Sequence, residues 1–223
     1  MIRLVTVTGS RTTTLKHMLN HYKDIVDEMY IVVYDWEEQS NLSEVQNIVS
    51  EFRNAKIVKT VIEEKYNWEK VTQLYNEVKS THPNDWWVIS DDDEFHSYSY
   101  SLKSIIGACD MNGWDIVRGG FVDRIGVDGE MVELLDTDDI FEKFPYAGFF
   151  RHPLSGANPN KICIAKGHVE ITNGQHYAKI DGHTTWKWQG WNHPQIAPIE
   201  MYNVQVHHFK WDSTCGERIR AVA

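Results

Sequence analysis

The sequence has little that would tie it to a secreted or membrane environment. It contains only three cysteines in 223 residues, Cys109, Cys163 and Cys215, with no C-x-x-C pair. An odd, scattered set is not typical of a disulfide framework or a zinc site and favours a reducing compartment. Met1 leads into an apolar run without a signal-peptide pattern, and no apolar run approaches the roughly 20 residues that span a bilayer. We therefore expect a cytoplasmic protein without a transmembrane segment.

The sequence also lacks an excess of positive charge. It has 22 Lys and Arg against 32 Asp and Glu, which gives a formal net charge of -10. Such a balance argues against binding of nucleic acid through the general field of the protein, so we expect no nucleic-acid partner. Aromatic residues, in contrast, make up 12% of the chain, with 9 Trp and 10 Tyr. These side chains fill cores, but they also stack on sugars and nucleobases.

The first hundred residues alternate strand and helix patterns. Short apolar runs predict four strands, at residues 2–8, 29–34, 56–61 and 86–90. Apolar residues at helical spacing predict helices at residues 15–26, 43–52, 68–78 and 102–109. Ser43 and Gln46 suggest a capping box at the second helix. The β-α-β order predicts an α/β fold, with a Rossmann-like, mainly parallel sheet that carries helices on both faces.

The pattern changes after residue 113. Residues 114–122 read as extended, Gly126 to Gly129 as a hairpin turn, and residues 136–160 as a long irregular loop of functional type. Further strands are predicted at residues 161–165, 169–172 and 202–209. We expect a single domain over residues 1–223, in which residues 1–113 form one half and residues 114–223 a second half with a smaller antiparallel extension.

Four consecutive acids, Asp91, Asp92, Asp93 and Glu94, follow the fourth predicted strand. Adjacent like charges repel one another, whereas a divalent cation would stabilise them, because carboxylate oxygens are its preferred ligands. In extended backbone Asp91 and Asp93 would point to the same side. The carboxyl end of a strand is also where α/β sheets bind ligands. The alternative is an acidic loop that caps the following helix.

The run from Asp91 to Phe95 resembles the D-x-D-E-F signature of family 2-like glycosyltransferases with the GT-A fold. Other segments resemble elements of this family in the same order, namely residues 31–35, 73–76, 174–177 and 207–209. Together they cover most of residues 2–211. The first loop differs from the commonest form of the family, because it contains Ser10-Arg11-Thr12.

The resemblance implies a GT-A-like fold and transfer of a sugar from a nucleotide-sugar, with UDP-sugar as the expected donor, to a glycan acceptor. Residues 1–113 would be the nucleotide-binding half and residues 114–223 the acceptor-binding half. The donor contacts implied are Thr8, Ser10, Arg11, Asp35, Asp91 and Asp92. The cofactor implied is Mn²⁺ or Mg²⁺, with Asp91, Asp93 and His208 as ligands.

His208 is preferred to His207 because it precedes Phe209, as the histidine of the family precedes an aromatic residue. Adjacent strand residues point to opposite faces, so only one of the two histidines can reach the site. Imidazole suits Mn²⁺ better than Mg²⁺. The alternative for either residue is a structural histidine.

The resemblance also implies an inverting transfer, which needs a base that takes the proton of the acceptor hydroxyl. Asp123 follows an apolar run and is our candidate, although a neighbouring Arg124 would lower the pKa of its carboxyl and weaken it as a base. The rivals are Glu133, Asp138 and Asp139.

Other residues have two interpretations each. Lys161 and Lys210 are either phosphate-binding cations or solvated lysines. Trp186 and Trp188 would share one face of a strand, as a sugar platform or as core next to Trp191. A second metal site is not indicated, because the remaining histidines are irregularly spaced, at His168, His176 and His183.

Three other functions remain open on sequence alone. A sugar-nucleotidyl transferase would need a glycine-rich phosphate loop with a basic residue, which Gly9-Ser10-Arg11 resembles only faintly. A metal-dependent nuclease or phosphohydrolase could also use clustered acids, although the negative net charge disfavours a nuclease. A non-catalytic glycan-binding module could use the tryptophans alone.

Overall fold

The computed structural model describes residues 1–9, 11–36, 41–185 and 193–215. The first part of the chain contains β1 (Ile2–Thr8), α1 (Leu15–Tyr22), β2 (Glu28–Trp36), α2 (Leu42–Ser50), β3 (Ala55–Glu63), α3 (Trp68–Ser80), β4 (Trp86–Ile89), β5 (Glu94–Tyr98) and α4 (Leu102–Asn112). The second part contains β6 (Ile116–Ile125), α5 (Ile140–Lys143), β7 (Tyr146–Gly148), α6 (Arg151–Ser155), β8 (Asn160–Lys166), β9 (Glu170–Ile171), β10 (Ala178–Ile180), β11 (His183–Thr184) and β12 (Val204–His208). Two short 3₁₀ helices lie at η1 (Val127–Gly129) and η2 (Asn173–Gln175).

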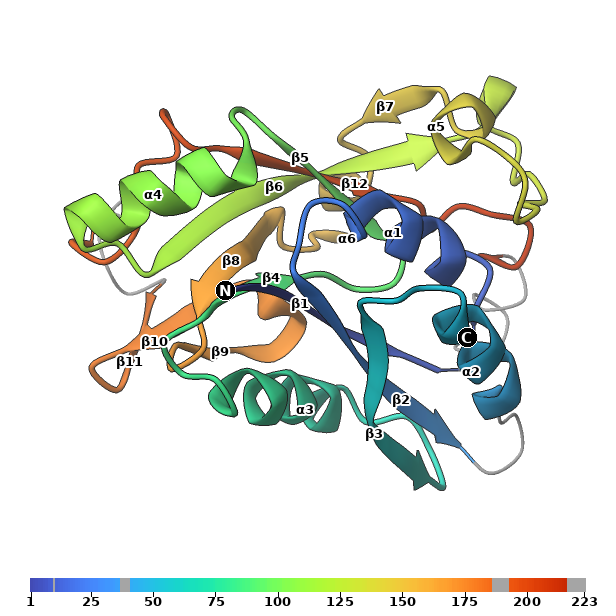
Figure 1. Cartoon of the computed structure of the whole chain (residues 1–223). Helices are drawn as coiled ribbons and strands as arrows, with labels where there is room; N and C mark the ends of the chain where they lie inside the picture. The colour runs from blue at the N-terminus through green and yellow to red at the C-terminus, as the bar shows by residue number, and fades with distance from the viewer. Residues whose placement is uncertain (10, 37–40, 186–192, 216–223) are drawn as a thin grey trace.

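These strands form a nine-stranded sheet and a small three-stranded sheet (Figure 1). The large sheet has the order β3-β2-β1-β4-β8-β6-β12-β5, and β7 pairs with β6. Strands β3, β2, β1 and β4 are parallel to one another, while β8 is antiparallel to both of its neighbours. The small sheet, β11-β10-β9, is antiparallel. The α/β prediction with a smaller antiparallel extension is thus confirmed.

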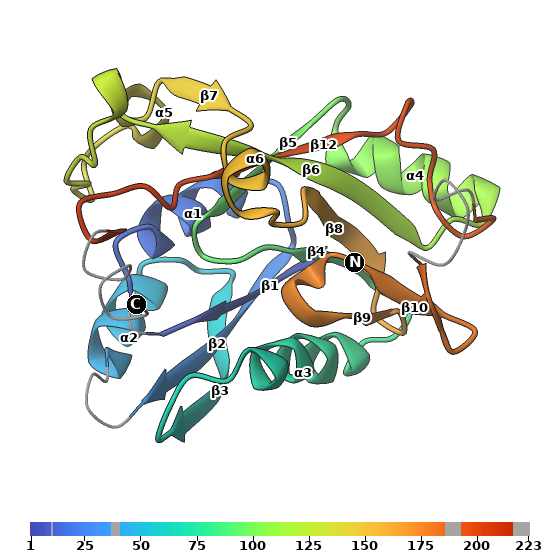
Figure 2. The same cartoon turned by 180° about the vertical axis from the view of Figure 1, so that it is seen from behind.

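Helices cover both faces of the large sheet, as the apolar periodicity predicts (Figures 1 and 2). On one face, Leu15 and Met18 of α1, Val45 of α2 and Ile105 of α4 belong to a single buried cluster. On the other face, α3 contributes Leu74, Tyr75 and Val78 to a second cluster, which also includes residues of the small sheet. The central strands are therefore apolar on both sides, and their polar ends are left to form the site.

Helix ends differ from prediction at two places. The helix predicted at residues 15–26 ends at Tyr22. The expected capping box is wrong, because α2 begins at Leu42, so that Ser43 lies inside the helix. A side chain outside the helix stabilises its start instead, since the backbone N–H of Asn41 donates to Asp35 Oδ2 at 2.7 Å. At α3 the side chain of Asn67 caps the helix by accepting from two backbone N–H groups.

The second part of the chain is more regular than its composition predicts. Gly126 and Gly129 close a turn, but the tight hairpin expected there is wrong, because β6 pairs with β7 beyond α5. The loop predicted at residues 136–160 contains α5, β7 and α6. These short elements bring residues 149–151 back against β6.

The three cysteines are free thiols and are buried. Within the described ranges, none of the helices combines the length and the apolar character that a bilayer crossing requires.

Candidate functional site

The site lies where β1 and β4 end side by side. The two strands are parallel neighbours, so Thr8 and the acids that follow β4 meet at the same edge of the sheet. Gly9 allows the loop after β1 to pass close to β2, because a Cβ at this position would lie 1.9 Å from the carbonyl oxygen of Tyr34. A turn closed by the backbone bond from Glu94 N to Asp91 O separates β4 from β5 and presents the acids.

A cavity of about 310 Å³ opens at this edge. Its lining is acidic and polar at Thr8, Arg11 and residues 91–93, and it also includes the aromatic residues Tyr66 and Trp68. Both rings are more than half exposed. A volume of this order suits a small ligand, and polar groups that converge on one wall of an otherwise apolar cleft are typical of a binding site.

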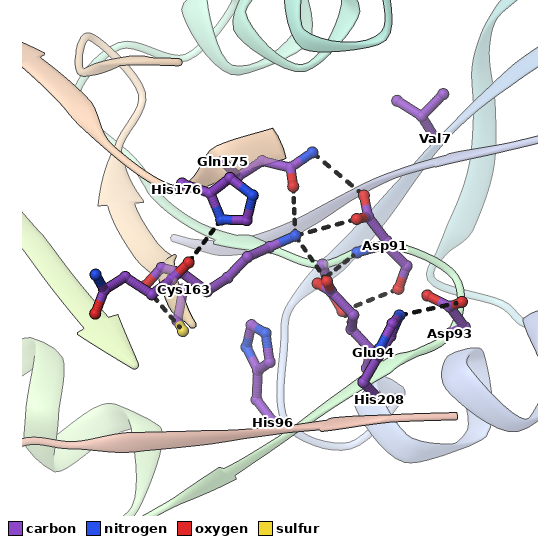
Figure 3. A network of polar contacts seen from close by, with 12 residues as sticks. Val7, Asp91, Asp93, Glu94, His96, Cys163, Gln175, His176 and His208 are labelled. Atoms are coloured by element: carbon purple, nitrogen blue, oxygen red, sulfur yellow. Dashed lines mark hydrogen bonds and ion pairs between the residues drawn. The ribbon is translucent and has the colours of Figure 1, made fainter. Parts of the chain in front are cut away.

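Asp91 and Glu94 both bind a buried lysine, and we call these two acids the lysine pair (Figure 3). Lys161 Nζ donates to Asp91 Oδ2 at 3.1 Å and to Glu94 Oε1 at 2.8 Å. It also donates to Gln175, whose side-chain N–H donates to Asp91 Oδ1 at 3.2 Å. Tyr75 donates its hydroxyl to Asp91 Oδ1 at 2.6 Å. The carboxylates of the lysine pair thus have partners within the protein.

The electrostatics of the lysine pair are those of a closed network. Lys161 is only 1% exposed, yet its pKa is raised, because attraction by Asp91 and Glu94 exceeds the lowering that burial causes. Burial raises the pKa of Glu94 to about 7, against the opposing effect of Lys161. Loss of Lys161 would leave two acids without their buried cation, which is costly.

Asp92 and Asp93 form a second pair, the cavity pair. Thr8 donates its hydroxyl to Asp92 Oδ2 at 2.7 Å, and Arg11 donates to Asp93 Oδ2 at 2.8 Å. Burial raises the pKa of Asp92 to about 7, although Arg11 opposes it, and the charge of Asp93 adds to the increase. His208 Nε2 lies 3.5 Å from Asp93 Oδ2, the same oxygen that accepts from Arg11.

The predicted convergence of Asp91 and Asp93 is altered by the turn. The prediction assumed extended backbone, whereas residues 92 and 93 lie in a turn, and Asp91 is directed to Lys161 instead. Among the described residues, no three His, Cys, Asp or Glu side chains gather as a ready-made metal centre. Ligation by Asp91, Asp93 and His208 together stays a prediction.

The donors that are present nevertheless suit a divalent cation held partly by a substrate. Asp93 and His208 offer oxygen and imidazole nitrogen only 3.5 Å apart, a separation that two ligands of one ion can adopt after small adjustments. Mg²⁺ is usually bound by one or two carboxylates together with substrate phosphates. The four acids of residues 91–94 face two permanent cations, Lys161 and Arg11. An added positive charge would therefore be favourable here.

Asp123, the predicted base, is buried beside His208. The two residues are register partners on the parallel strands β6 and β12. Asp123 Oδ2 accepts from the backbone N–H groups of Phe150 and Arg151, and Oδ1 lies 3.4 Å from His208 Nδ1. Burial raises the pKa of Asp123, but the bonds from His208 and Arg151 outweigh it and leave the pKa lowered.

Arg124 does not supply the pKa effect expected of it on Asp123. Its guanidinium lies over the ring of Phe141, 4.9 Å from the centroid, and donates to the carbonyl of Pro145. The lowered pKa of Asp123 comes from His208 and from a backbone N–H instead.

Of the other candidates, Asp35 is buried and is not among the described residues that line the cavity. Asp138 pairs with Lys143, and Asp139 caps α5, so both stabilise local structure. Four predicted residues lie outside the described ranges, namely Ser10, Trp186, Trp188 and Trp191.

The sequence interpretation missed Gln175 and Tyr75, which hold Asp91, and the aromatic lining residues Tyr66 and Trp68. Gln175 had a signal, because it lies in the segment 174–177 that carries the family resemblance. Its positive φ of 53° follows Gly174, and this turn directs the side chain inward. Tyr75 lies in the segment 73–76, which also carries the resemblance, but it fits the apolar face of its helix and so is interpreted as core.

A larger cavity, of about 600 Å³, lies between α3 and the β9 region and shares Thr72 with the first. Its polar lining includes Glu69, Glu77 and Glu170, without the acidic turn that follows β4. We assign the site to the smaller cavity, because the charged groups with perturbed pKa values converge there.

No protein-family model matches the chain, and no curated protein is similar to it in sequence. Several solved structures are distantly similar. Residues 1–349 of S. aureus TarS in complex with UDP are 14% identical, with a TM-score of 0.41, over 74% of this chain and 46% of that chain. For 4-diphosphocytidyl-2C-methyl-D-erythritol synthase the identity is 12%, the TM-score 0.38 and the coverage 75% of both chains. HddC from Yersinia pseudotuberculosis is 10% identical, with a TM-score of 0.38, over 68% of this chain and 83% of that chain. The chain thus spans less than half of the TarS chain, and function has to be argued from the site.

Proposed function

We propose that this protein is a metal-dependent glycosyltransferase that transfers a sugar from a nucleotide-sugar, with UDP-sugar as the expected donor, to a glycan acceptor. The observation that carries the proposal is the cavity at the ends of β1 and β4, which is lined by the cavity pair together with Tyr66 and Trp68. The resemblance of residues 91–95 to the D-x-D-E-F signature supports the same assignment.

The cavity lining offers a group for each part of a nucleotide-sugar. Arg11 is the one arginine or lysine among the described lining residues, and it can turn from Asp93 toward a diphosphate. Tyr66 and Trp68 expose ring faces on which a base or a sugar can stack. Thr8 offers a hydroxyl, which now donates to Asp92.

Mn²⁺ or Mg²⁺, when bound, supplies positive charge that stabilises the departing diphosphate. Asp93 and His208 are the residues that would hold it, and Asp91 would support them by fixing the turn through Lys161. The base stays open, because the lowered pKa of Asp123 makes its carboxylate a weak proton acceptor. We keep residues 114–223 as the proposed acceptor-binding half.

Sugar-nucleotidyl transfer is the second candidate, favoured by one observation. Gly9 and Arg11 of the first loop both line the cavity, as a phosphate-binding loop with a basic residue would. Such an enzyme would join a nucleoside triphosphate to a sugar phosphate and release pyrophosphate.

The test is to supply both substrate sets and to measure the products. With UDP-sugars, Mn²⁺ and a panel of glycans, the glycosyltransferase releases UDP and elongates a glycan, and EDTA abolishes the release. With nucleoside triphosphates and sugar 1-phosphates, the nucleotidyl transferase releases pyrophosphate instead. Glycan binding that ignores Mn²⁺, without release of UDP or pyrophosphate, would point to a binding module and reject both proposals.

A further inference from the structure

Asp123, His208 and Asp93 lie in a row that runs from the buried sheet to the cavity. Asp123 Oδ1 is 3.4 Å from His208 Nδ1, and His208 Nε2 is 3.5 Å from Asp93 Oδ2. Asp123 is 1% exposed and His208 4% exposed. Figure 3 shows His208 directed at Asp93, beside the lysine pair. The imidazole therefore connects a fully buried carboxylate to one at the cavity.

Asp123 is itself fixed in orientation. Its Oδ2 accepts from the backbone N–H groups of Phe150, at 3.2 Å, and Arg151, at 2.9 Å. Its Oδ1 faces His208 and the indole N–H of Trp211, at 3.5 Å. It is not among the described residues that line the cavity. A group held in this way is poorly placed to take a proton from an acceptor, but well placed to orient an imidazole.

We propose that Asp123 is a positioning residue, whose carboxylate holds His208 with Nδ1–H directed at Asp123 and the Nε2 lone pair directed at a cation on Asp93. A carboxylate only accepts hydrogen bonds, so each ring nitrogen of His208 can donate to the carboxylate that it faces. A cation on Asp93 would take the lone pair of Nε2, and the proton would then stay on Nδ1, toward Asp123. In the neutral imidazole the other nitrogen is then free to bind a metal, and carboxylate partners of this kind strengthen such ligands. This inference rests on the metal of the proposed function.

Arg151 is the group that opposes this arrangement. Its NH1 lies 3.5 Å from His208 Nδ1, and its guanidinium lies over the ring of Phe121, 4.4 Å from the centroid. A cationic donor that faces Nδ1 favours the tautomer with its proton on Nε2. Asp123 Oδ1 competes with this donor, because it lies at 3.4 Å from the same ring nitrogen.

The decisive variant is Asp123→Asn. Because the two backbone N–H groups need an acceptor at Oδ2, the amide oxygen should stay there and the NH₂ group should face His208 Nδ1. The amide then donates to Nδ1, which moves the imidazole proton to Nε2 and blocks this ligand. The tautomer is read by ¹⁵N NMR of histidine-labelled protein without metal, at a pH where His208 is neutral. The affinity for Mn²⁺ alone is read by titration calorimetry.

We expect an Nδ1–H tautomer in the wild type and an Nε2–H tautomer in Asp123→Asn. The affinity of Asp123→Asn for Mn²⁺ should be about 10- to 100-fold weaker than that of the wild type. Asp139→Asn, at the helix cap of α5, is the matched control and should change neither measurement. The double variant Asp123→Asn with His208→Ala should bind Mn²⁺ no more weakly than His208→Ala alone, since both act through one ligand.

The outcomes separate positioning from base catalysis. If Asp123→Asn loses turnover while the tautomer and the Mn²⁺ affinity stay unchanged, Asp123 is the base and the positioning role is overturned. An Nε2–H tautomer in the wild type overturns it as well, and this measurement requires no variant to fold. Failure of the wild type to bind Mn²⁺ both alone and with UDP overturns the proposed function and with it the ligand role of Nε2, whereas Nδ1–H would still uphold the bond to Asp123.

Discussion

The four acids that follow β4 divide into two pairs with opposite surroundings. The lysine pair, Asp91 and Glu94, is neutralised within the protein by Lys161. The cavity pair, Asp92 and Asp93, lines the cavity together with Arg11, and Asp93 also lies 3.5 Å from the buried His208. Neighbouring acids thus have different partners in the protein. The first pair is held by a buried lysine, whereas the second is held by Arg11 and Thr8, and both of its residues line the cavity.

This difference shows that an acidic motif need not act as a unit. The outer two carboxylates, of Asp91 and Glu94, bind Lys161 and fix the loop. The inner two, of Asp92 and Asp93, bind Thr8 and Arg11, which line the cavity with them. Substitutions in the two pairs should consequently have different effects, on stability for the lysine pair and on binding for the cavity pair.

The largest effect on stability is expected for Lys161→Met. The substitution leaves Asp91 and Glu94 without their buried cation, which should lower the free energy of unfolding by about 3–5 kcal/mol. Urea denaturation measures the loss. Lys59→Met, which removes an exposed pair with Glu77, is the control and should cost less than about 1 kcal/mol. Equal losses in the two variants would mean that the buried network of Lys161 stabilises the fold no more than an exposed ion pair does.

Asp93→Asn should show the reverse pattern. The amide keeps an oxygen for Arg11, so the free energy of unfolding should change little. Binding of UDP that depends on Mn²⁺ should disappear, because the carboxylate that holds the cation is gone. Calorimetry with and without Mn²⁺ measures this, and Asp24→Asn at an exposed position is the control. Retained Mn²⁺-dependent binding would remove Asp93 from the metal site.

For Asp92→Asn we expect a smaller difference in the free energy of unfolding from the wild type, and this difference should depend on pH. The folded protein holds the pKa of Asp92 at about 7, above the usual 3.8. Below 3.8 the carboxyl is protonated in both states, and as the pH rises toward 7 the wild type loses the stability that the bound proton gives. The variant should thus gain stability relative to the wild type between these pH values. Urea denaturation across this range, without metal, tests the trend, and a constant difference would contradict it.

Asp35→Ala should have the smallest effect on stability and on UDP binding, and it tests whether Asp35 belongs to the site. Asp35 accepts from the backbone of Asn41, so its loss should weaken the start of α2 by about 1 kcal/mol, as for a helix cap. Because Asp35 does not line the cavity, UDP affinity should change little. A large loss of UDP affinity would instead support the nucleobase or ribose contact that the sequence predicts.

Much of the fold could be predicted, because apolar runs and helical spacing are local signals. The run that ends at Ile89 placed the acids at the correct edge of the sheet. The pairing of β6 with β12, which brings Asp123 to His208, joins segments far apart in the sequence and has no local signal. Lys161 was equally hidden, since a lysine at the start of a strand reads as solvated until β8 is known to lie in the middle of the sheet.

The most direct test of the account is a titration of the protein with UDP, in Mn²⁺ and again in EDTA. If a cation on Asp93 grips the diphosphate, saturable binding appears with Mn²⁺ and vanishes in EDTA. Binding of equal strength in both solutions would contradict the central claim, because the nucleotide would then be held without the ion.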